Sequence, residues 1–418
     1  MRITIVISSP ELVRNYLSSN ALVALAEKHD LNLFYNKSLS IPNNSLSLFK
    51  SVETYETRDS FNLSRLIQDL HMLRWKSKSS GFRYRIKRKY PSFIWEILRI
   101  SKQLKDRRQS FNESSDSKKF SSILKNETKF VMLRVYLVMI LVTKQIKKIF
   151  LFTLAEKHLF PLTIKSLYWL RTKNYEIHSY FERNHFDLLL YPSSAYEPEL
   201  IDIISGASNS KIKSLMLIDN WDNLSSKTVI SHRPDFIATW GEQSTHHAVS
   251  IQGFAKEKCF NLGTPRIDSY FFERVNQFKA PLDYKYILVV GSSAPYDEAG
   301  LIYKLDYEIA QNPEIYGLTR VLYRPHPLRS SLDKINFENL KKTDLDPSVA
   351  RSYLRDNNLD IQNIPLPELE GYSNLISNSS IVISGITSMM IEASIFNKKC
   401  LVMGFEEPSN ITSPAKML

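Results

Sequence analysis

Three segments near the end of the chain each lead from a run of branched aliphatic residues directly into a turn, and this pattern restricts the fold more than any other feature. The segments are Tyr286–Pro295, Val321–Leu328 and Ile381–Phe405. A buried parallel strand that delivers a loop has this composition. Because the carboxyl ends of parallel strands share one edge of a sheet, we expect the three loops to meet there and to bind a ligand.

The first part of the chain predicts a second sheet of the same kind. About the first 35 residues read as a strand, a helix and a strand, which is the opening of a parallel sheet. Further strands are expected at Phe186–Pro192, Ser214–Trp221 and Asp235–Gly241. A short polar stretch then precedes the strand at Tyr286. The sequence therefore predicts an α/β protein with an N-terminal domain over residues 1–280 and a C-terminal domain over residues 281–418.

A basic segment over about residues 60–175 interrupts the first sheet. Between Arg74 and Lys148 there are 21 Lys and Arg against 5 Asp and Glu, whereas the whole chain carries a net charge of +12. All of the excess charge thus lies in this segment, which we expect to be a helical insertion with a Ser-rich loop at Ser110–Ser122.

Three interpretations of the insertion are open: a face that lies on an anionic membrane, a solvated helical pair packed on the domain, or a nucleic-acid surface. The apolar run Phe130–Val142 has 13 residues and contains Arg134, so it is too short and too charged to span a bilayer. No nucleic-acid motif is present, and we expect no nucleic-acid partner. A membrane surface would use aromatic anchors, for which we nominate Trp75, Tyr84, Phe93 and Trp95.

The overall amino-acid composition is typical of a folded protein. Hydrophobic residues make up 43% of the 418 positions. The two cysteines, Cys259 and Cys400, have no metal or redox spacing, and the amino terminus has no signal-peptide pattern. We therefore expect a cytoplasmic protein that is peripheral on the inner face of the cell membrane.

The order of three motifs resembles a known family. Leu262–Asp268 (LGTPRID), Arg324–Pro327 (RPHP) and Ile383–Lys399 (ISGITSMMIEASIFNKK) together resemble GT-B glycosyltransferases of bacterial surface-polysaccharide biosynthesis. The resemblance is closest to the CDP-glycerol glycerophosphotransferase and Kdo-transferase-like group, and it covers residues 187–405. It implies two Rossmann-like domains facing across a cleft, a nucleotide-sugar or CDP-glycerol donor held by the C-terminal domain, and no metal or other cofactor.

The resemblance also implies a donor site. His326 would face the donor phosphates with Arg324, and Thr387 and Ser388 would hold the diphosphate where a helix begins. Glu392 would accept the ribose hydroxyls. The residues that complete this site are Ser292, Ser293, Ser384 and Gly385.

Each donor residue also has an ordinary structural explanation. A His between two prolines can be a rigid strand end, and Ser or Thr before a helix can be an N-cap. Ser292 and Ser293 can belong to a tight turn. Many retaining members of the family have a second Glu where this chain has Cys400, so the stereochemistry stays open.

Polar residues after the strand at Ser214–Trp221 are candidates for the acceptor side of the cleft. Asp219 or Asp222 would remove the acceptor proton, and Asn220, Trp221 and Lys227 would line the acceptor. An Asx-rich turn with Ser caps explains the same residues. The pair Asp344 and Asp346 has the spacing of a metal-binding motif, but we assign no site to it and expect no metal.

The family's C-terminal domain continues beyond the strand that ends near Phe405, whereas only 13 residues follow here. We therefore expect an incomplete C-terminal domain, because the chain is either a fragment or a shortened member. Two other functions fit a two-domain fold of this kind: a UDP-sugar 2-epimerase, which needs no acceptor, and a non-catalytic scaffold.

Overall fold

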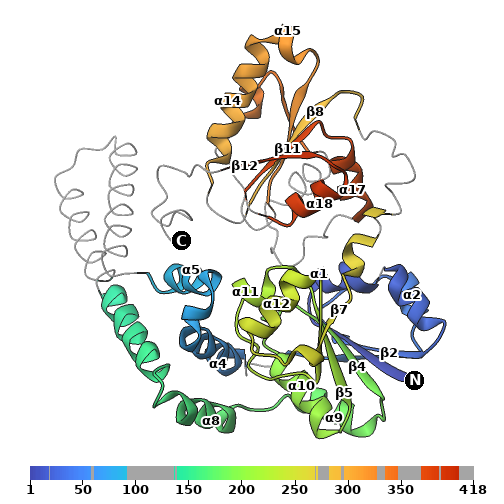
Figure 1. Cartoon of the computed structure of the whole chain (residues 1–418), viewed down its shortest axis with the longest axis vertical. Helices are drawn as coiled ribbons and strands as arrows, with labels where there is room; N and C mark the ends of the chain where they lie inside the picture. The colour runs from blue at the N-terminus through green and yellow to red at the C-terminus, as the bar shows by residue number, and fades with distance from the viewer. Residues whose placement is uncertain are drawn as a thin grey trace, which may run out of the picture.

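A computed structural model describes residues 1–17, 19–57, 61–91, 136, 139–268, 270–271, 282–292, 296–326, 335–346, 369–385 and 387–403. These residues form two Rossmann-like α/β domains, each built on a parallel sheet, as the sequence predicts (Figure 1). The predicted domain boundary at residue 280 lies outside the described residues and stays a prediction.

Within the described residues, the first sheet has seven strands in the spatial order β3-β2-β1-β4-β5-β6-β7, and every neighbouring pair is parallel. The order reverses between β1 and β4, which makes this the switch point of the sheet. The strands are β1 (Arg2–Ile7), β2 (Asp30–Asn36), β3 (Ser51–Tyr55), β4 (Leu188–Ser193), β5 (Lys213–Ile218), β6 (Phe236–Thr239) and β7 (Cys259–Asn261).

Apolar side chains cover both faces of this sheet, which explains why its central strands read as continuous apolar runs. Ile3, Ile5 and Ile7 of β1 enter one core, whereas Val6 enters the core on the opposite face. The helices of this domain are α1 (Pro10–Leu12), a π-helical turn (Val13–Leu17), α2 (Asn20–Ala26), α3 (Asn43–Leu46), α9 (Tyr175–Arg183), α10 (Leu200–Asn209), α11 (Asn223–Ser226) and α12 (Glu242–Ser250).

The second sheet has five described strands in the order β10-β9-β8-β11-β12, again all parallel. They are β8 (Tyr286–Val290), β9 (Arg320–Arg324), β10 (Thr343–Leu345), β11 (Ile381–Ser384) and β12 (Lys399–Val402). Val290 is in register with both Arg324 and Ser384, so β9, β8 and β11 end level with one another. The described helices are α14 (Glu298–Gln311), α15 (Pro313–Tyr316), α17 (Leu369–Ser377) and α18 (Met389–Ile395).

Where the structure describes it, the basic insertion between β3 and β4 is helical, as predicted. It contains α4 (Phe61–Arg74), α5 (Ser80–Lys89), a helix over residues 139–154 and α8 (Phe160–Leu170). These helices share a small apolar core that includes Leu70, Phe82 and Leu151, and Val229 of the first domain completes it. The predicted Ser-rich loop, Phe93, Trp95 and Arg134 lie outside the described residues.

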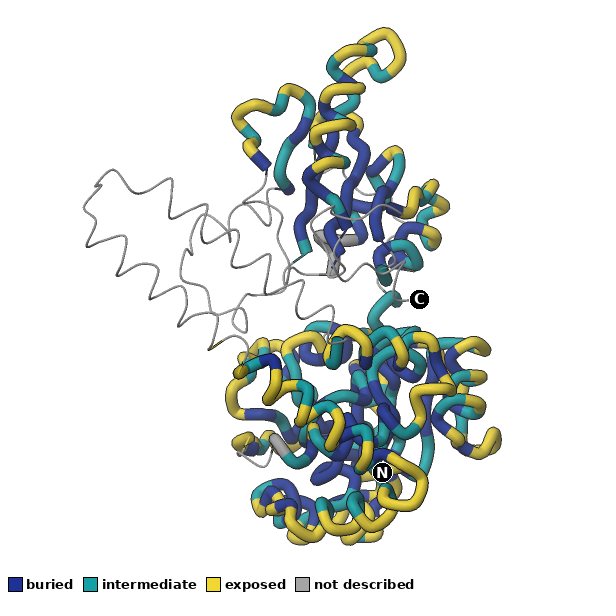
Figure 2. The backbone as a smooth tube through the Cα atoms, turned by 90° about the vertical axis from the view of Figure 1, so that its left-hand side faces the viewer, coloured by how far each residue is buried: buried dark blue, intermediate teal, exposed yellow. Residues whose placement is uncertain are grey.

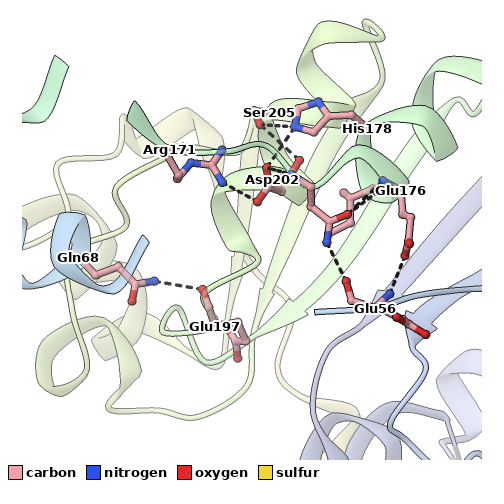
Figure 3. Close-up of polar contacts among 10 residues, drawn as sticks. Glu56, Gln68, Arg171, Glu176, His178, Glu197, Asp202 and Ser205 are labelled. Atoms are coloured by element: carbon pink, nitrogen blue, oxygen red, sulfur yellow. Dashed lines mark hydrogen bonds and ion pairs between the residues drawn. The ribbon is translucent and has the colours of Figure 1, made fainter. Parts of the chain in front are cut away.

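A buried polar network fastens the end of the insertion to the first domain (Figure 3). Asp202 of α10 accepts a hydrogen bond from Arg171 Nη1 at 2.6 Å, and its other oxygen lies 3.2 Å from His178 Nε2. The side chain of Asn174 donates to the carbonyl of Glu56 at 2.9 Å. Burial raises the pKa of Asp202, but hydrogen bonds from His178 and Arg171 outweigh it and hold the pKa below its ordinary value. The entry and exit of the insertion are thereby joined.

Burial follows the two sheets, with exposed residues on the outer helices and loops (Figure 2). Within the described part of the chain, no helix combines the length and apolar character that crossing a bilayer requires.

Candidate functional site

The loops after β8, β9 and β11 meet at the edge of the second sheet. A Cβ atom on Gly291 would lie 2.5 Å from the backbone nitrogen of His326, and one on Gly385 would lie 2.3 Å from the Tyr296 ring and 3.1 Å from Ser292 Cβ. Neither glycine could carry a side chain without moving its neighbours. The structure therefore brings Ser292, His326 and Gly385 together, where the strand-to-turn pattern expected a ligand.

Glu298, which the sequence analysis missed, holds the first of these loops. It begins α14, is fully buried, and accepts a hydrogen bond from the Ser292 backbone nitrogen at 2.9 Å and from the Tyr323 hydroxyl at 2.6 Å. Gly291 N also donates to the Arg324 carbonyl at 2.8 Å. A carboxylate inside a helix has no distinguishing sequence pattern, so only the fold reveals this contact.

The serine and threonine residues after β11 differ in their contacts. Ser384 Oγ lies 3.1 Å from Thr387 Oγ1, so these two hydroxyls share a hydrogen bond. Ser388 occupies the N-cap position of α18, but its hydroxyl makes no capping hydrogen bond and instead accepts one from Arg266 Nη2 at 3.3 Å. The N-cap explanation therefore does not account for the Ser388 side chain. Ser293 lies outside the described residues.

Arg324 is bound to a residue that the sequence analysis set aside. Its guanidinium forms a buried ion pair with Asp346, which follows β10. Asp344, within β10, forms a partly exposed ion pair with Arg320, with Nη2 to Oδ1 at 2.8 Å. These aspartates are thus ion-pair partners of β9. Arg324 accordingly fixes the end of β9, which leads to His326. Direct contact between Arg324 and a donor phosphate stays a prediction.

The two domains contact each other through Arg266 of the LGTPRID motif. Arg266 Nη2 donates to Glu392 Oε1 of α18 at 2.7 Å, and Tyr270 donates to Glu392 Oε2 at 3.0 Å. Arg266 Nε is buried and has no hydrogen-bond partner among the described residues. Burial lowers the pKa of Arg266, but the Glu392 carboxylate and then Asp219 more than compensate and raise it. Glu392, predicted to bind ribose, therefore carries an interdomain ion pair in this structure.

Asp219 lies on the first-domain side of the same contact. It follows β5, is 9% exposed, and accepts a hydrogen bond from Asn15 Nδ2 at 2.9 Å. Burial raises its pKa, which the Asn15 hydrogen bond and the charge of Arg266 partly oppose. Tyr16 is also buried, and its burial, together with the negative charge of Asp219, raises the pKa of Tyr16 well above its ordinary value. Asp219 is thus an acidic group held at the interdomain contact with weakened acidity.

The other acceptor-side candidates form a local turn. Asp222 Oδ2 accepts from Ser226 Oγ at 2.6 Å, and Asn220 Oδ1 accepts from the Trp221 backbone nitrogen at 3.0 Å. Lys227 follows α11 as its C-cap. These contacts match the Asx-turn explanation. Proton removal by Asp222 stays a prediction, as does acceptor binding by Asn220, Trp221 and Lys227.

The basic insertion borders the first-domain loops. Ser79, which caps α5, donates to the Ser225 carbonyl at 2.5 Å. Arg65 and Arg85 lie over the ring of Tyr196, at 5.4 and 4.2 Å from its centroid. Tyr196 belongs to the loop after β4, so cations from α4 and α5 reach the loops at the carboxyl edge of the first sheet.

The loop after β4 also contains a carboxyl group with a strongly perturbed pKa. Glu199 is 7% exposed. Burial, with a further contribution from nearby Glu197, raises the pKa of Glu199 to about 7, although its own backbone hydrogen bond opposes the change. Glu197 itself accepts from Ser193 Oγ at 2.5 Å and from the Ser194 backbone at 2.7 Å.

Within the described residues, no three His, Cys, Asp or Glu side chains gather as a metal site would require. Independence from metal ions is not tested by this and stays a prediction.

Comparison with known proteins gives low similarity throughout. No protein-family model and no curated protein matches the chain. A solved structure of a putative UDP-N-acetylglucosamine 2-epimerase from Listeria monocytogenes is 10% identical, covers 98% of this chain and 80% of its own, and gives a TM-score of 0.49. The UDP-GlcNAc 2-epimerase from Methanocaldococcus jannaschii is 12% identical, with 96% and 83% covered and a TM-score of 0.46.

A transferase structure also matches. The E. coli heptosyltransferase WaaC with ADP-2-deoxy-2-fluoro heptose is 10% identical, with 96% of this chain and 88% of that chain covered and a TM-score of 0.32. At these identities and TM-scores, neither the epimerases nor the transferase decides which reaction this chain performs.

Proposed function

We propose that this protein is a glycosyltransferase of the GT-B type that moves a sugar from a nucleotide-activated donor to a lipid-linked or growing surface polysaccharide. One observation carries the proposal: the loops after β8, β9 and β11 meet at one edge of the second sheet, and Arg266 of the first domain pairs with Glu392 of α18 while its charge acts on the buried Asp219. Donor and acceptor groups would then share one interdomain contact.

In this proposal the second domain binds the donor diphosphate. His326, Ser292, Ser384 and Thr387 supply hydrogen-bond donors at the level strand ends, and Glu298 keeps the first loop in place. Charge that develops on the leaving phosphate would be stabilised by these groups, which need no rearrangement at the moment of reaction. A ribose at Glu392 would compete with Arg266 for the same carboxylate oxygen.

Asp219 would act as the general base. A carboxylate whose pKa is raised by burial accepts a proton more readily than an exposed one, which suits removal of the acceptor hydroxyl proton. Asn15 would orient it through the hydrogen bond to Oδ1. The acceptor would reach this group past the loops that the basic insertion borders, on the inner face of the membrane.

A transfer assay tests the proposal. Purified protein is incubated with nucleotide sugars, and separately with CDP-glycerol, in the presence and absence of a lipid-linked glycan fraction. We expect product only with the acceptor, and a loss of about 10²- to 10⁴-fold in rate for Asp219→Asn. Asp235→Asn is the matched control, because Asp235 pairs with Lys213 at the opposite end of the same strands.

The alternatives give different results in the same assay. A UDP-sugar 2-epimerase would convert the nucleotide sugar without acceptor, and a scaffold would leave every donor unchanged. Product from CDP-glycerol alone among the donors would identify a glycerophosphotransferase. Any of these outcomes would overturn the proposal of sugar transfer.

A further inference from the structure

The last two helices of the insertion each carry exposed apolar side chains on one side, which no other described element covers. On the helix over residues 139–154, the exposed apolar residues recur every three or four positions, so they share one side of the helix. Ile149 is 66% exposed although it is fully apolar. The exposed stripe consists of Met139, Val142, Ile146, Ile149 and Phe150.

The opposite side of this helix already packs on the protein. Leu151, and Ala155 directly after the helix, are buried in the core of the insertion, where Phe82 and Ile86 of α5 lie in the same cluster. The exposed stripe is therefore a second apolar face and is not needed for the helix to pack.

Helix α8 repeats this arrangement. Phe160, Ile164 and Leu167 pack against the insertion core. Trp169 is 84% exposed and Leu162 is 68% exposed, and both lie on the outer side of α8 with Leu159 and Leu170. Large apolar side chains gathered on one exposed side mark an interaction surface, whereas a single exposed one does not.

The charge around these stripes indicates what covers them. Between residues 139 and 170 there are five Lys and a single Glu. Exposed aromatic and aliphatic side chains interleaved with lysine are the composition of a helix that lies in the interface of an anionic bilayer. Arg171, at the end of α8, is fixed by Asp202, so this element is anchored to the domain.

We propose that the helix over residues 139–154 and α8 together form a membrane-docking face, made by Ile146, Ile149, Phe150, Leu162, Trp169 and Leu170. The occupant is the surface of an anionic phospholipid bilayer. This inference rests on the inner-membrane location in the proposed function and assigns it to residues other than the aromatic anchors nominated from the sequence. Trp75, one of those anchors, is only 37% exposed and has Lys78 over its ring.

Co-sedimentation with vesicles tests the docking face. The full-length protein is mixed with phosphatidylcholine vesicles that contain about one third phosphatidylglycerol, or with phosphatidylcholine alone. We expect binding to the anionic vesicles, reduced about tenfold or more in the triple variant Leu162→Ser, Trp169→Ser and Leu170→Ser, and in the pair Ile146→Ser and Phe150→Ser. Lys147→Gln with Lys165→Gln should weaken binding in the same direction.

A matched control separates a specific face from general stickiness. Leu318, next to α15 in the other domain, is 84% exposed, as Trp169 is, and Ile315 is 71% exposed. Ile315→Ser with Leu318→Ser should leave vesicle binding unchanged. An equal loss in this control, or unchanged binding in the docking-face variants, would overturn the assignment.

Two further readouts isolate the inference from the proposed function. Sedimentation velocity without lipid reports self-association, and a dimer that only the docking-face variants abolish would mean that a second copy covers the face. Nucleotide-induced thermal shifts should be the same in these variants as in the wild type. A wild-type protein that binds nucleotide but no vesicles would refute membrane docking and leave sugar transfer standing.

Discussion

Arg266 Nη2 lies 2.7 Å from Glu392 Oε1, and this ion pair joins the segment after β7 of the first sheet to helix α18 of the second domain. Both side chains are largely buried, at 12% and 3% exposure. A buried pair fixes geometry because either partner alone is costly to keep out of water. Together with the Tyr270 and Ser388 contacts, this ion pair ties the first domain to α18 of the second.

Removal of either partner should be strongly destabilising. We expect Arg266→Met or Glu392→Met each to cost about 3–5 kcal/mol, because the remaining charge is left buried and unpaired. The double variant should cost much less than the sum of the two. Urea unfolding of the four proteins measures this coupling, and strictly additive costs would show that the pair does not act as a unit.

The network around Asp202 should control attachment of the insertion. Asp202→Asn removes the charge that holds Arg171 and His178, and we expect a loss of about 3–5 kcal/mol in the free energy of unfolding. Limited proteolysis should then cut first in the insertion. Asp235→Asn, which removes a partly exposed ion pair with Lys213, should cost about 1 kcal/mol or less. Equal effects of the two substitutions would contradict this role.

Gly291 should be intolerant of any side chain. In Gly291→Ala the new Cβ would lie 2.5 Å from the His326 backbone nitrogen, so one of the two loops must move. We expect nucleotide affinity to fall about tenfold or more, because moving either loop misplaces the hydrogen-bond donors that it carries. Gly241→Ala is the control, because its Cβ would meet nothing within 4 Å. Calorimetric titration with whichever nucleotide stabilises the wild type compares the two variants.

Glu199 should make stability depend on pH. Its pKa is raised to about 7, so the folded state disfavours the ionised form, and the stability present at low pH is lost as pH rises from about 4.5 through 7. Glu199→Gln stays neutral, so its stability relative to the wild type should increase by up to about 3 kcal/mol between pH 5 and pH 9. A constant difference across this range would mean that Glu199 ionises normally.

The sequence predicted the strand ends well, because buried parallel strands leave a strong apolar signal. Val290, Arg324 and Ser384 are level, as the three strand-to-turn segments implied. The pattern could not show where side chains point. Arg324 binds Asp346, and Asp344 lies within a strand where none was expected, since a strand of three residues is too short to leave a period.

The interdomain contact is the part of the site that the sequence predicts least. The sequence analysis predicts that Glu392 binds ribose and places Arg266 in the LGTPRID motif. Nothing local in either segment indicates that the two side chains form a hydrogen bond. Glu298 and Asn15 were missed for the same reason: their partners lie elsewhere in the chain, and only the fold brings them together.

The most direct test of a nucleotide-dependent transferase is a thermal-shift screen of the wild type and His326→Ala against CMP, CDP, UDP, GDP, ADP and dTDP. At about 100 times its dissociation constant, a bound nucleotide should add about 2.7 kcal/mol to stability. We predict that one nucleotide class stabilises the wild type and that His326→Ala abolishes this stabilisation. If no nucleotide stabilises the wild type, the second domain does not hold a donor, and the proposed transfer reaction is wrong.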